Sequence, residues 1–229
     1  NERPEDFPKS NRVGEGLRPL LGNSVFVTNG ETWKRQRRII DPAFEGGRLR
    51  DTFPAMWAAG QAAVARISPG VREVEADMSH AAADVIFRTL FSIPIEHEVA
   101  SQVFTQFRDY QRSQPILNLA AFLPLPPKIM TTKDPQTGQG FETGEMVDQV
   151  AIFFLAGHET SASALAWALY LMAQFPETQE KVAAEAMTLG DTPDFSAVAK
   201  LRFTRDVFRE TLRLYPPVPM MVRQNTCPE

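Results

Sequence analysis

The chain has 229 residues, of which 43% are hydrophobic and 23% are charged, a composition typical of soluble globular proteins. Its formal net charge of −4 argues against a nucleic-acid-binding protein, because such proteins usually carry an excess of basic residues. The single cysteine, Cys227, excludes a disulfide framework within the chain and fits a reducing cytoplasm, the localisation that we expect. The longest unbroken apolar run, residues 150–156, is far shorter than a membrane span, so we expect no membrane-spanning segment.

The first 28 residues are rich in proline and glycine and show no hydrophobic period. We therefore expect mostly loop there, with room for one short helix. The chain starts with neither a methionine nor the apolar region of a signal peptide, and we expect it to be a piece of a longer protein. A helix is expected to start after Asn29, which can cap it, and to end before Pro42.

Apolar side chains recur at helical spacing in most of the remaining sequence, and prolines or glycines end each stretch. These patterns predict helices at residues 47–67, 78–92, 96–112, 177–189 and 203–214. The polar segment 131–141, which contains one proline and two glycines, predicts a loop. Because no stretch shows sustained strand alternation, the sequence predicts a mainly α fold.

The longest predicted helix covers residues 143–174, which contain no proline and are followed by Phe175 and Pro176. At 1.5 Å per residue such a helix is about 48 Å long. Its middle, residues 150–156, is apolar on every face. We therefore expect this helix to pass through the core of the protein.

The segment that follows this apolar run, residues 156–161 (AGHETS), breaks the usual rules of a buried helix. Gly157 costs about 1 kcal/mol relative to alanine in a helix, and the charge of Glu159 needs a partner or solvent. Thr160 can donate its hydroxyl to the carbonyl one turn back and bend the helix. These features predict a local opening where a ligand approaches the backbone. The alternative is a helix–helix crossing at Gly157 with Glu159 facing solvent.

Two further pairs of side chains lie at helical spacing. Glu210 and Arg213 are three residues apart, and such a pair on a helix surface is usually a weak ion pair. Trp33 and Arg37 are four residues apart, and an indole N–H beside a guanidinium can bind a carboxylate. The alternative for the second pair is a core tryptophan next to a solvated basic face.

Taken in order, these three motifs resemble those of the cytochrome P-450 family, the haem-thiolate monooxygenases. Trp33-x-x-x-Arg37 is similar to the family's helix C motif, residues 156–161 to its oxygen-activating helix I motif, and residues 210–217 (ETLRLYPP) to its helix K ExxR signature. The resemblance implies a mainly α, P-450-like fold with minor β structure. It also implies one incomplete catalytic domain that spans residues 1–229.

The resemblance implies catalytic roles within the helix I motif. Thr160 would hydrogen-bond dioxygen at the haem, and Glu159 would help to route protons towards it. Gly157 would leave room for the oxygen ligand, and Ala156 would lie over the haem face.

Other residues are implied to bind the haem or to hold its surroundings in place. Trp33, Arg37 and Arg223 match the positions that bind the anionic haem propionates in the family. Glu210 and Arg213 would be structural and would anchor the segment that leads to the cysteine loop.

Apolar residues next to the motifs are candidates for contacts with the substrate, with core packing as the alternative for each. These residues are Ile152, Leu155, Met220 and Met221.

Three regions of the family are missing from the sequence, the first of them at its start. Between Pro126 and Pro127 the chain passes directly across the place of helices F and G, so we expect a missing segment at this join. The third is the loop that supplies the axial cysteine. Cys227 lacks the glycines of that loop and is expected to be incidental, so no metal ligand is expected in this chain.

The resemblance implies a monooxygenase that uses haem b and O2 to insert one oxygen atom into a small apolar substrate, with electrons from a ferredoxin- or flavodoxin-type donor. Lys34, Arg35 and Arg38 are expected to be exposed and to form part of the docking face for that donor, with a solvated helix face as the alternative. We expect a monomer. The competing function is an inactive P-450-like fragment that only binds a ligand or a protein. A metalloprotease is excluded, because the second histidine of HExxH is missing after His158.

Overall fold

The structure, a computed structural model, describes residues 6–113, 133–220, 222–224 and 226. The α-helices of these residues are α1 (Asn11–Leu21), α2 (Gly30–Ile40), α3 (Gly46–Arg66), α4 (Val74–Ile86), α5 (Glu98–Ser113), α7 (Thr143–Gln174), α8 (Pro176–Met187) and α9 (Arg202–Leu214). Short 3-10 helices at Asp41–Phe44 and Phe195–Lys200 and a π-helical turn at Phe87–Phe91 accompany them. The prediction of a mainly α fold is thereby confirmed. In the described residues, β pairing is limited to an antiparallel bridge between Lys9 and Arg223.

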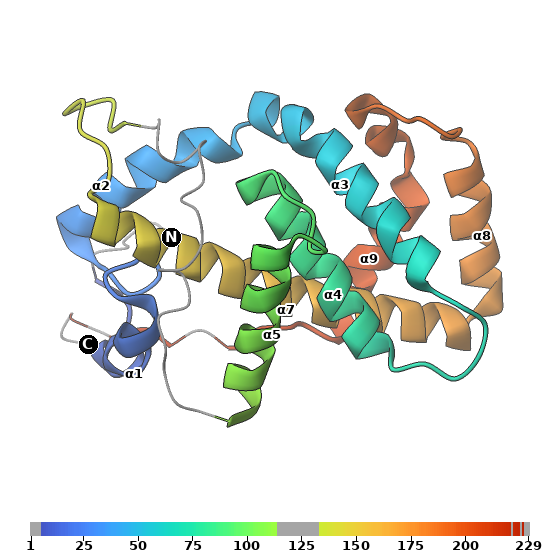
Figure 1. Ribbon diagram of the computed structural model, residues 1–229, viewed down its shortest axis with the longest axis horizontal. Coiled ribbons are helices and arrows are strands. Elements are labelled where there is room, and N and C mark those ends of the chain that lie inside the picture. The colour runs from blue at the N-terminus through green and yellow to red at the C-terminus, as the bar shows by residue number, and fades with distance from the viewer. Residues whose placement is uncertain (1–5, 114–132, 221, 225, 227–229) are drawn as a thin grey trace.

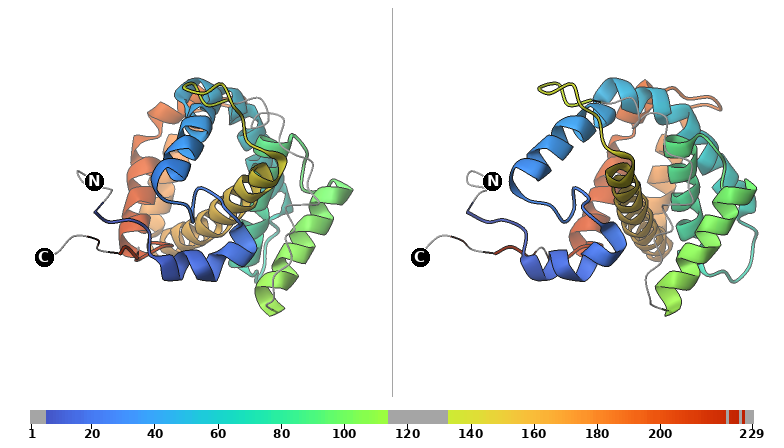
Figure 2. Two further views of the ribbon diagram at one scale, coloured as in Figure 1. Left: turned by 90° about the vertical axis from the view of Figure 1, so that its left-hand side faces the viewer. Right: turned by 60° about the vertical axis from the view of Figure 1, so that its left-hand side comes forward.

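Helix α7 runs through the middle of the molecule, and the other helices surround it (Figures 1 and 2). Its bounds are those expected from the sequence. The backbone N–H of Phe175 still donates to Leu171 O at 2.9 Å, and Pro176 then begins α8, where a proline needs no helical N–H partner. Val150 and Phe154 lie on one side of α7 and Ile152 lies on the opposite side, and all three are buried, so the helix does pass through the core.

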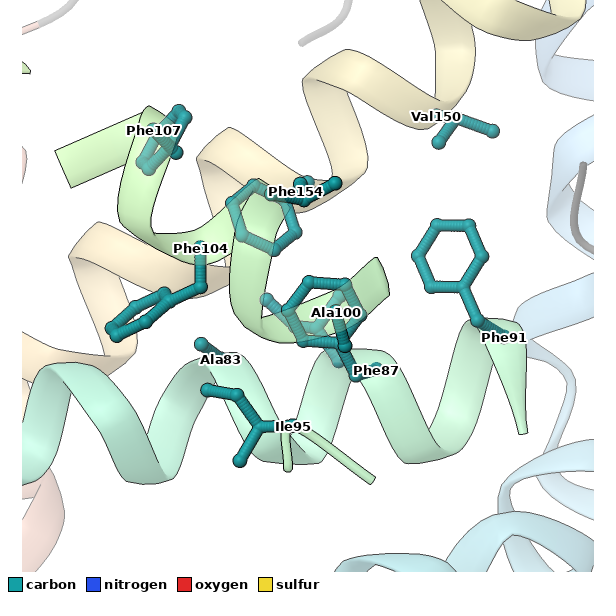
Figure 3. Packing of buried hydrophobic residues seen from close by; sticks show 11 residues of the cluster. Ala83, Phe87, Phe91, Ile95, Ala100, Phe104, Phe107, Val150 and Phe154 are labelled. Atoms are coloured by element: carbon teal, nitrogen blue, oxygen red, sulfur yellow. The ribbon is translucent and has the colours of Figure 1, made fainter. Parts of the chain in front are cut away.

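The largest hydrophobic cluster lies between α4, α5 and α7 and is built mainly from phenylalanines (Figure 3). Phe154 of α7 has its ring centroid 5.0 Å from Phe107 of α5 and 5.4 Å from Phe87, which follows α4. Such tilted and edge-to-face pairs add to the free energy gained by burying the rings. This cluster holds α4 and α5 against one face of α7, just before the helix I motif.

Helix α1 is the short helix that the sequence left room for, and the other described residues before Asn29 are not helical, as expected. Leu17, Leu20 and Leu21 lie on one side of α1 and pack with Ile152 of α7. This tertiary packing outweighs Pro19, which lies inside the helix and disfavours it locally.

A close backbone approach at Gly22 ends α1. Its φ of +51° and ψ of −130° lie outside the regions open to other residues, and a Cβ there would lie 2.1 Å from Asp148 Oδ1 of α7. The next backbone N–H, that of Asn23, donates to Asp148 Oδ2 at 2.8 Å. Glycine is therefore required for α1 to dock on α7.

The remaining differences from the sequence predictions are small. Helix α4 begins four residues before the predicted start at residue 78, and the π-helical turn that follows it ends at Ser92, whose φ is +60°. The 3-10 helix Phe195–Lys200 was not predicted and is capped by Asp194, whose carboxylate accepts from Ala197 N at 3.0 Å. A search of the described helices finds none that combines the length and the apolar character of a membrane span.

Candidate functional site

A cluster of cationic side chains lies where the start of the described chain meets its end. Lys9 pairs with Arg223 through a backbone bridge, and the Lys9 ammonium lies 5.4 Å from the ring centroid of Trp33 on α2. Arg37, one helical turn after Trp33, is close enough for its charge to act on Lys9. The structure therefore brings together three residues that the sequence singled out, Trp33, Arg37 and Arg223, around a fourth, Lys9, that it did not.

The charges of this cluster are only partly balanced. Burial is the main cause that lowers the pKa of Lys9, and the positive charges of Arg223 and Arg37 add to it. Together they bring this pKa to about 8. Lys9 Nζ donates to carbonyl oxygens, those of Val25 at 2.7 Å and Thr28 at 2.8 Å, rather than to a carboxylate. Arg37 pairs with Asp41 at 2.8 Å, and both side chains are about half exposed. Such a group of cations next to an indole favours an anionic ligand.

The helix I motif lies where α7 crosses α4. The hydroxyl of Thr160 donates to Ala156 O at 2.6 Å, which confirms the hydrogen bond one turn back that was predicted for it. A Cβ on Gly157 would lie 3.1 Å from Ile86 Cδ1 of α4, and the Glu159 side chain is 52% exposed. The crossing that the sequence left open as an alternative is thus present, and Ala156 next to it is exposed.

Two hollows meet at Thr160. A polar cavity of about 590 Å³ is lined by residues of α4, α5 and α7 that include Ser79, Arg108, Glu159 and Thr160. A smaller and more apolar groove of about 380 Å³ runs between α7 and α9, where Thr160 and Phe208 are among its lining residues. Thr160 therefore lies between a polar space and an apolar one, and the Glu159 carboxylate lines the polar space.

His158 was considered from the sequence only as part of an incomplete HExxH motif, and its surroundings were not predicted. Its side chain is fully buried, and Nε2 lies 2.8 Å from Ser79 Oγ of α4. The spacing along α7 could have indicated this burial. His158 follows the apolar Phe154 by one helical turn and therefore lies on the same side of the helix. Nothing in the local sequence indicates Ser79 as its partner.

The predicted docking face on α2 is wrong for two of its three residues. Arg38 forms two hydrogen bonds of 3.0 Å to the carboxylate of Asp134, and Arg35 is hydrogen-bonded to Glu145. Both arginines are partly buried, because the loop before α7 and the first turn of α7 pack on this face of α2. Lys34 is more exposed and pairs with Glu31 at 3.1 Å.

These pairs fix the loop before α7. Hydrogen bonds from Arg38 and from the backbone N–H of Gln136 lower the pKa of Asp134 to about 2. Asp134 therefore stays ionised at neutral pH, and the segment predicted as a loop is held against α2.

The ExxR pair is formed in the structure. Arg213 Nε and Nη2 donate to the two carboxylate oxygens of Glu210 at 2.8 Å and 2.6 Å, and these hydrogen bonds lower the pKa of Glu210. Both side chains are more than half exposed, so the pair adds little stability to the described residues.

The predicted substrate contacts do not lie on one surface. Ile152 is 4% exposed and belongs to the cluster around α1, which is the core packing left open as its alternative. Leu155 is partly buried and packs against two hydrophobic clusters. Met220 is 80% exposed. Met221, Cys227 and the join between residues 126 and 127 lie outside the described residues.

In the described part of the chain, no group of three or more histidine, cysteine, aspartate or glutamate side chains could hold a metal ion. His158 is surrounded by aromatic rings and bonded to Ser79, so its ring nitrogens face the protein interior.

Comparison with known proteins gives one consistent result. The family model described as Cytochrome P450 matches residues 1–134 and, in a second match, residues 97–228. Cyclooctat-9-en-7-ol 5-monooxygenase of Streptomyces melanosporofaciens is 31% identical over 96% of this chain and 57% of its own length. Cytochrome P450 714D1 of Oryza sativa subsp. japonica is 28% identical over 96% of this chain and 50% of its own length.

A solved structure with a similar fold is also found. The crystal structure of the cytochrome P450DA heme domain superposes with a TM-score of 0.74 at 22% identity, over 91% of this chain and 56% of that one. The chain thus has a mainly helical fold like that of a P450 heme domain, but an incomplete one. It spans about half the length of the curated relatives that it matches.

Proposed function

The chain belongs to the cytochrome P450 family, and from this premise we propose that it contributes to a haem-dependent monooxygenase, which inserts one oxygen atom from O2 into an apolar organic substrate. Family membership supports the class of reaction. The electrons would come from a redox partner of the ferredoxin or flavodoxin type. The proposal concerns the whole protein, of which this chain spans a part.

The observation that carries the proposal is the cationic cluster of Lys9, Trp33, Arg37 and Arg223. Asp41 pairs with Arg37, and the lowered pKa of Lys9 reflects its burial and the repulsion from the like charges of Arg223 and Arg37. The two propionate groups of haem b are carboxylates that would relieve this repulsion and accept hydrogen bonds from the indole and guanidinium groups. These residues therefore fit that part of the haem.

When bound, haem would supply the oxygen activation, which no side chain can perform alone. Within the chain, Glu159 can exchange protons with solvent because its side chain is half exposed, and Thr160 lies beside it on the same cavity. The apolar groove between α7 and α9 would keep water away from an apolar substrate at Thr160.

The iron ligand is the part that the chain does not supply. The family's cysteine loop is absent from this sequence. The second candidate function is a P450-like module that binds a ligand or a protein without catalysis.

The carbon-monoxide difference spectrum of the reduced, haem-loaded protein separates the two functions. A strongly red-shifted Soret band shows a thiolate ligand on the haem and supports the monooxygenase. Haem binding without that shift supports the module that only binds. A protein that takes up no haem contradicts the proposed cofactor and leaves the binding of a protein partner.

A further inference from the structure

His158 lies in an aromatic pocket that would suit a phenylalanine. Its ring is stacked on Phe154 with a centroid distance of 5.7 Å and an interplanar angle of 14°. Phe104 and Phe107 of α5 contact it edge-on at 5.8 Å and 5.6 Å. Burying an imidazole in such a pocket costs free energy unless both ring nitrogens find partners.

Only one of the two nitrogens has a hydrogen bond. Nε2 lies 2.8 Å from Ser79 Oγ, whereas Nδ1 is buried and has no hydrogen-bond partner in the structure. Nδ1 lies 3.6 Å from Glu159 Oε1, which is too long for a hydrogen bond. The carboxylate of Glu159 therefore lies just out of reach of a buried nitrogen.

Electrostatics selects the tautomer of this ring. Burial is the main cause that lowers the pKa of His158. The charge of Glu159 and a hydrogen bond to the Ser79 backbone oppose this shift, Arg108 adds to it, and the net lowering favours the neutral imidazole at pH 7. A proton on Nδ1 would face the negative charge of Glu159, whereas a proton on Nε2 would turn a lone pair towards it. The first form is favoured, and in it the hydroxyl of Ser79 donates to Nε2.

Other charged groups share the cavity. Glu73 and Glu75 at the start of α4 and Arg108 of α5 line it together with Ser79 and Glu159. Among these carboxylates, Glu159 is the one with an oxygen within 4 Å of a ring nitrogen of His158.

We propose that His158 is a positioning residue for Glu159, whose Nδ1–H holds the Glu159 carboxylate beside Thr160 at the polar cavity. A hydrogen bond of about 2.8 Å requires a movement of less than about 1 Å, which a half-exposed glutamate side chain can make. Ser79 supports this role indirectly. Its hydroxyl donates a hydrogen bond to Nε2, which favours the tautomer with the proton on Nδ1. The inference rests on the proposed function in one respect, namely that Glu159 carries protons in the proposed monooxygenase.

The test is nuclear magnetic resonance of the chain with ¹⁵N-labelled histidine, without haem. The chain has three histidines, so a His158→Gln variant identifies the signals of His158 in two-bond ¹H–¹⁵N spectra. At pH 7 we expect the Nδ1–H tautomer, with a downfield Nδ1–H resonance that is protected from exchange. The Nε2–H tautomer in the wild type would overturn the proposal.

Two surface variants then separate positioning from packing. Glu159→Ala removes the carboxylate that faces Nδ1, so we expect the Nδ1–H resonance to move upfield and part of the population to change to the Nε2–H tautomer. Glu75→Ala removes an equal charge from the same cavity and is expected to leave the spectrum of His158 unchanged. If Glu159→Ala also leaves it unchanged, His158 serves packing alone and the proposal is wrong.

This result does not depend on the cofactor. A chain that shows the expected tautomer but takes up no haem contradicts the proposed function and leaves the contact between His158 and Glu159 in place. A chain that binds haem but shows the Nε2–H tautomer contradicts the positioning role alone.

Discussion

The polar side chains in the first half of α7 and those in its middle differ in their hydrogen bonding and exposure. In the first half, Asp148 accepts from Asn23 N and Gln149 Oε1 accepts from Val25 N, both at 2.8 Å. Glu145 accepts from Gln36 Nε2 at 2.8 Å and from Arg35. Asp148 and Gln149 thus bind the segment between α1 and α2, and Glu145 binds α2 itself.

In the middle of α7 the polar groups have looser surroundings. Thr160 donates to a carbonyl of its own helix, and the Glu159 side chain is half exposed on a cavity. His158 Nδ1 has no hydrogen bond, but the same is true of Gln149 Nε2 in the first half. The two regions differ in the exposure of their acidic side chains, 15% for Glu145 and 52% for Glu159, so the first half serves the fold while the middle offers a carboxylate that a proton can reach. Changes in the first region and in the core should therefore cost stability, and changes in the second should cost function.

The largest loss of stability is expected from Phe154→Ala in the core beside α4 and α5. Removing a ring that contacts Phe87 and Phe107 leaves a cavity, and such changes cost about 3–5 kcal/mol of unfolding free energy. Urea unfolding measures this loss. Leu169→Ala on the same helix, where the side chain is 38% exposed, serves as the control and should cost much less.

The next largest loss of stability is expected at Gly22, which packs against the first half of α7, and it contrasts with Gly157 in the middle of the helix. Gly22→Ala should lose roughly 3 kcal/mol, because its backbone conformation is strained for alanine and the new Cβ collides with Asp148. Gly157→Ala should stay within about 1 kcal/mol of the wild type, because alanine favours the helix and the nearest atom is the flexible end of Ile86. Equal losses in urea unfolding would contradict the division of α7 into two regions.

The pair of Asp134 and Arg38 predicts a pH dependence of folding. The pKa of Asp134 is lowered to about 2 in the folded chain and is about 4 in an unfolded one, so its stabilising effect is full above pH 4 and is lost as the pH falls towards 2. Asp134→Asn should lower stability at pH 6 and remove this part of the pH dependence. Urea midpoints of both proteins between pH 2 and pH 6 measure the difference, and parallel curves would contradict the pair.

Lys9 predicts a smaller effect that belongs to the binding of an anion. Its pKa of about 8 means that its positive charge is lost above pH 8, while the arginines keep theirs. Haemin affinity should therefore fall between pH 7 and pH 9.5, by about threefold to tenfold. In Lys9→Met this decline should be absent. An unchanged decline in the variant would assign the titration to another group.

The smallest effect is expected from Glu210→Gln. Both members of its ion pair with Arg213 are more than half exposed, so the midpoint of urea unfolding should not change measurably. A clear loss of stability would show that the pair supports the fold of this chain through more than its own hydrogen bonds.

Sequence patterns predicted the helices whose signals are local. Helix α7 was predicted with its observed bounds because an unbroken apolar stretch ends at Pro176, and α2 because Asn29 and Pro42 mark its ends. The position of α1 was not predicted, because Pro19 disfavours the helix locally and its leucines gain their stability only against α7.

The candidate site was predictable where its residues lie within one helix. The hydrogen bond of Thr160 follows from spacing, whereas the ion pair of Arg38 with Asp134 joins residues 96 positions apart. Lys9 and Ser79 were missed for the same reason, since each acts on a residue that only the tertiary fold brings near. Long-range pairing of this kind has no local signal in a single sequence.

The most direct test of the account is a haemin titration of the chain, compared with the double variant Arg37→Gln, Arg223→Gln. If the cationic cluster binds the propionates, the variant should bind haemin roughly tenfold or more weakly, because charge-assisted hydrogen bonds are lost. Arg50→Gln, which removes a charge from exposed surface on α3, should bind like the wild type. Equal affinity of the wild type and the double variant would contradict the assignment of this cluster to the haem.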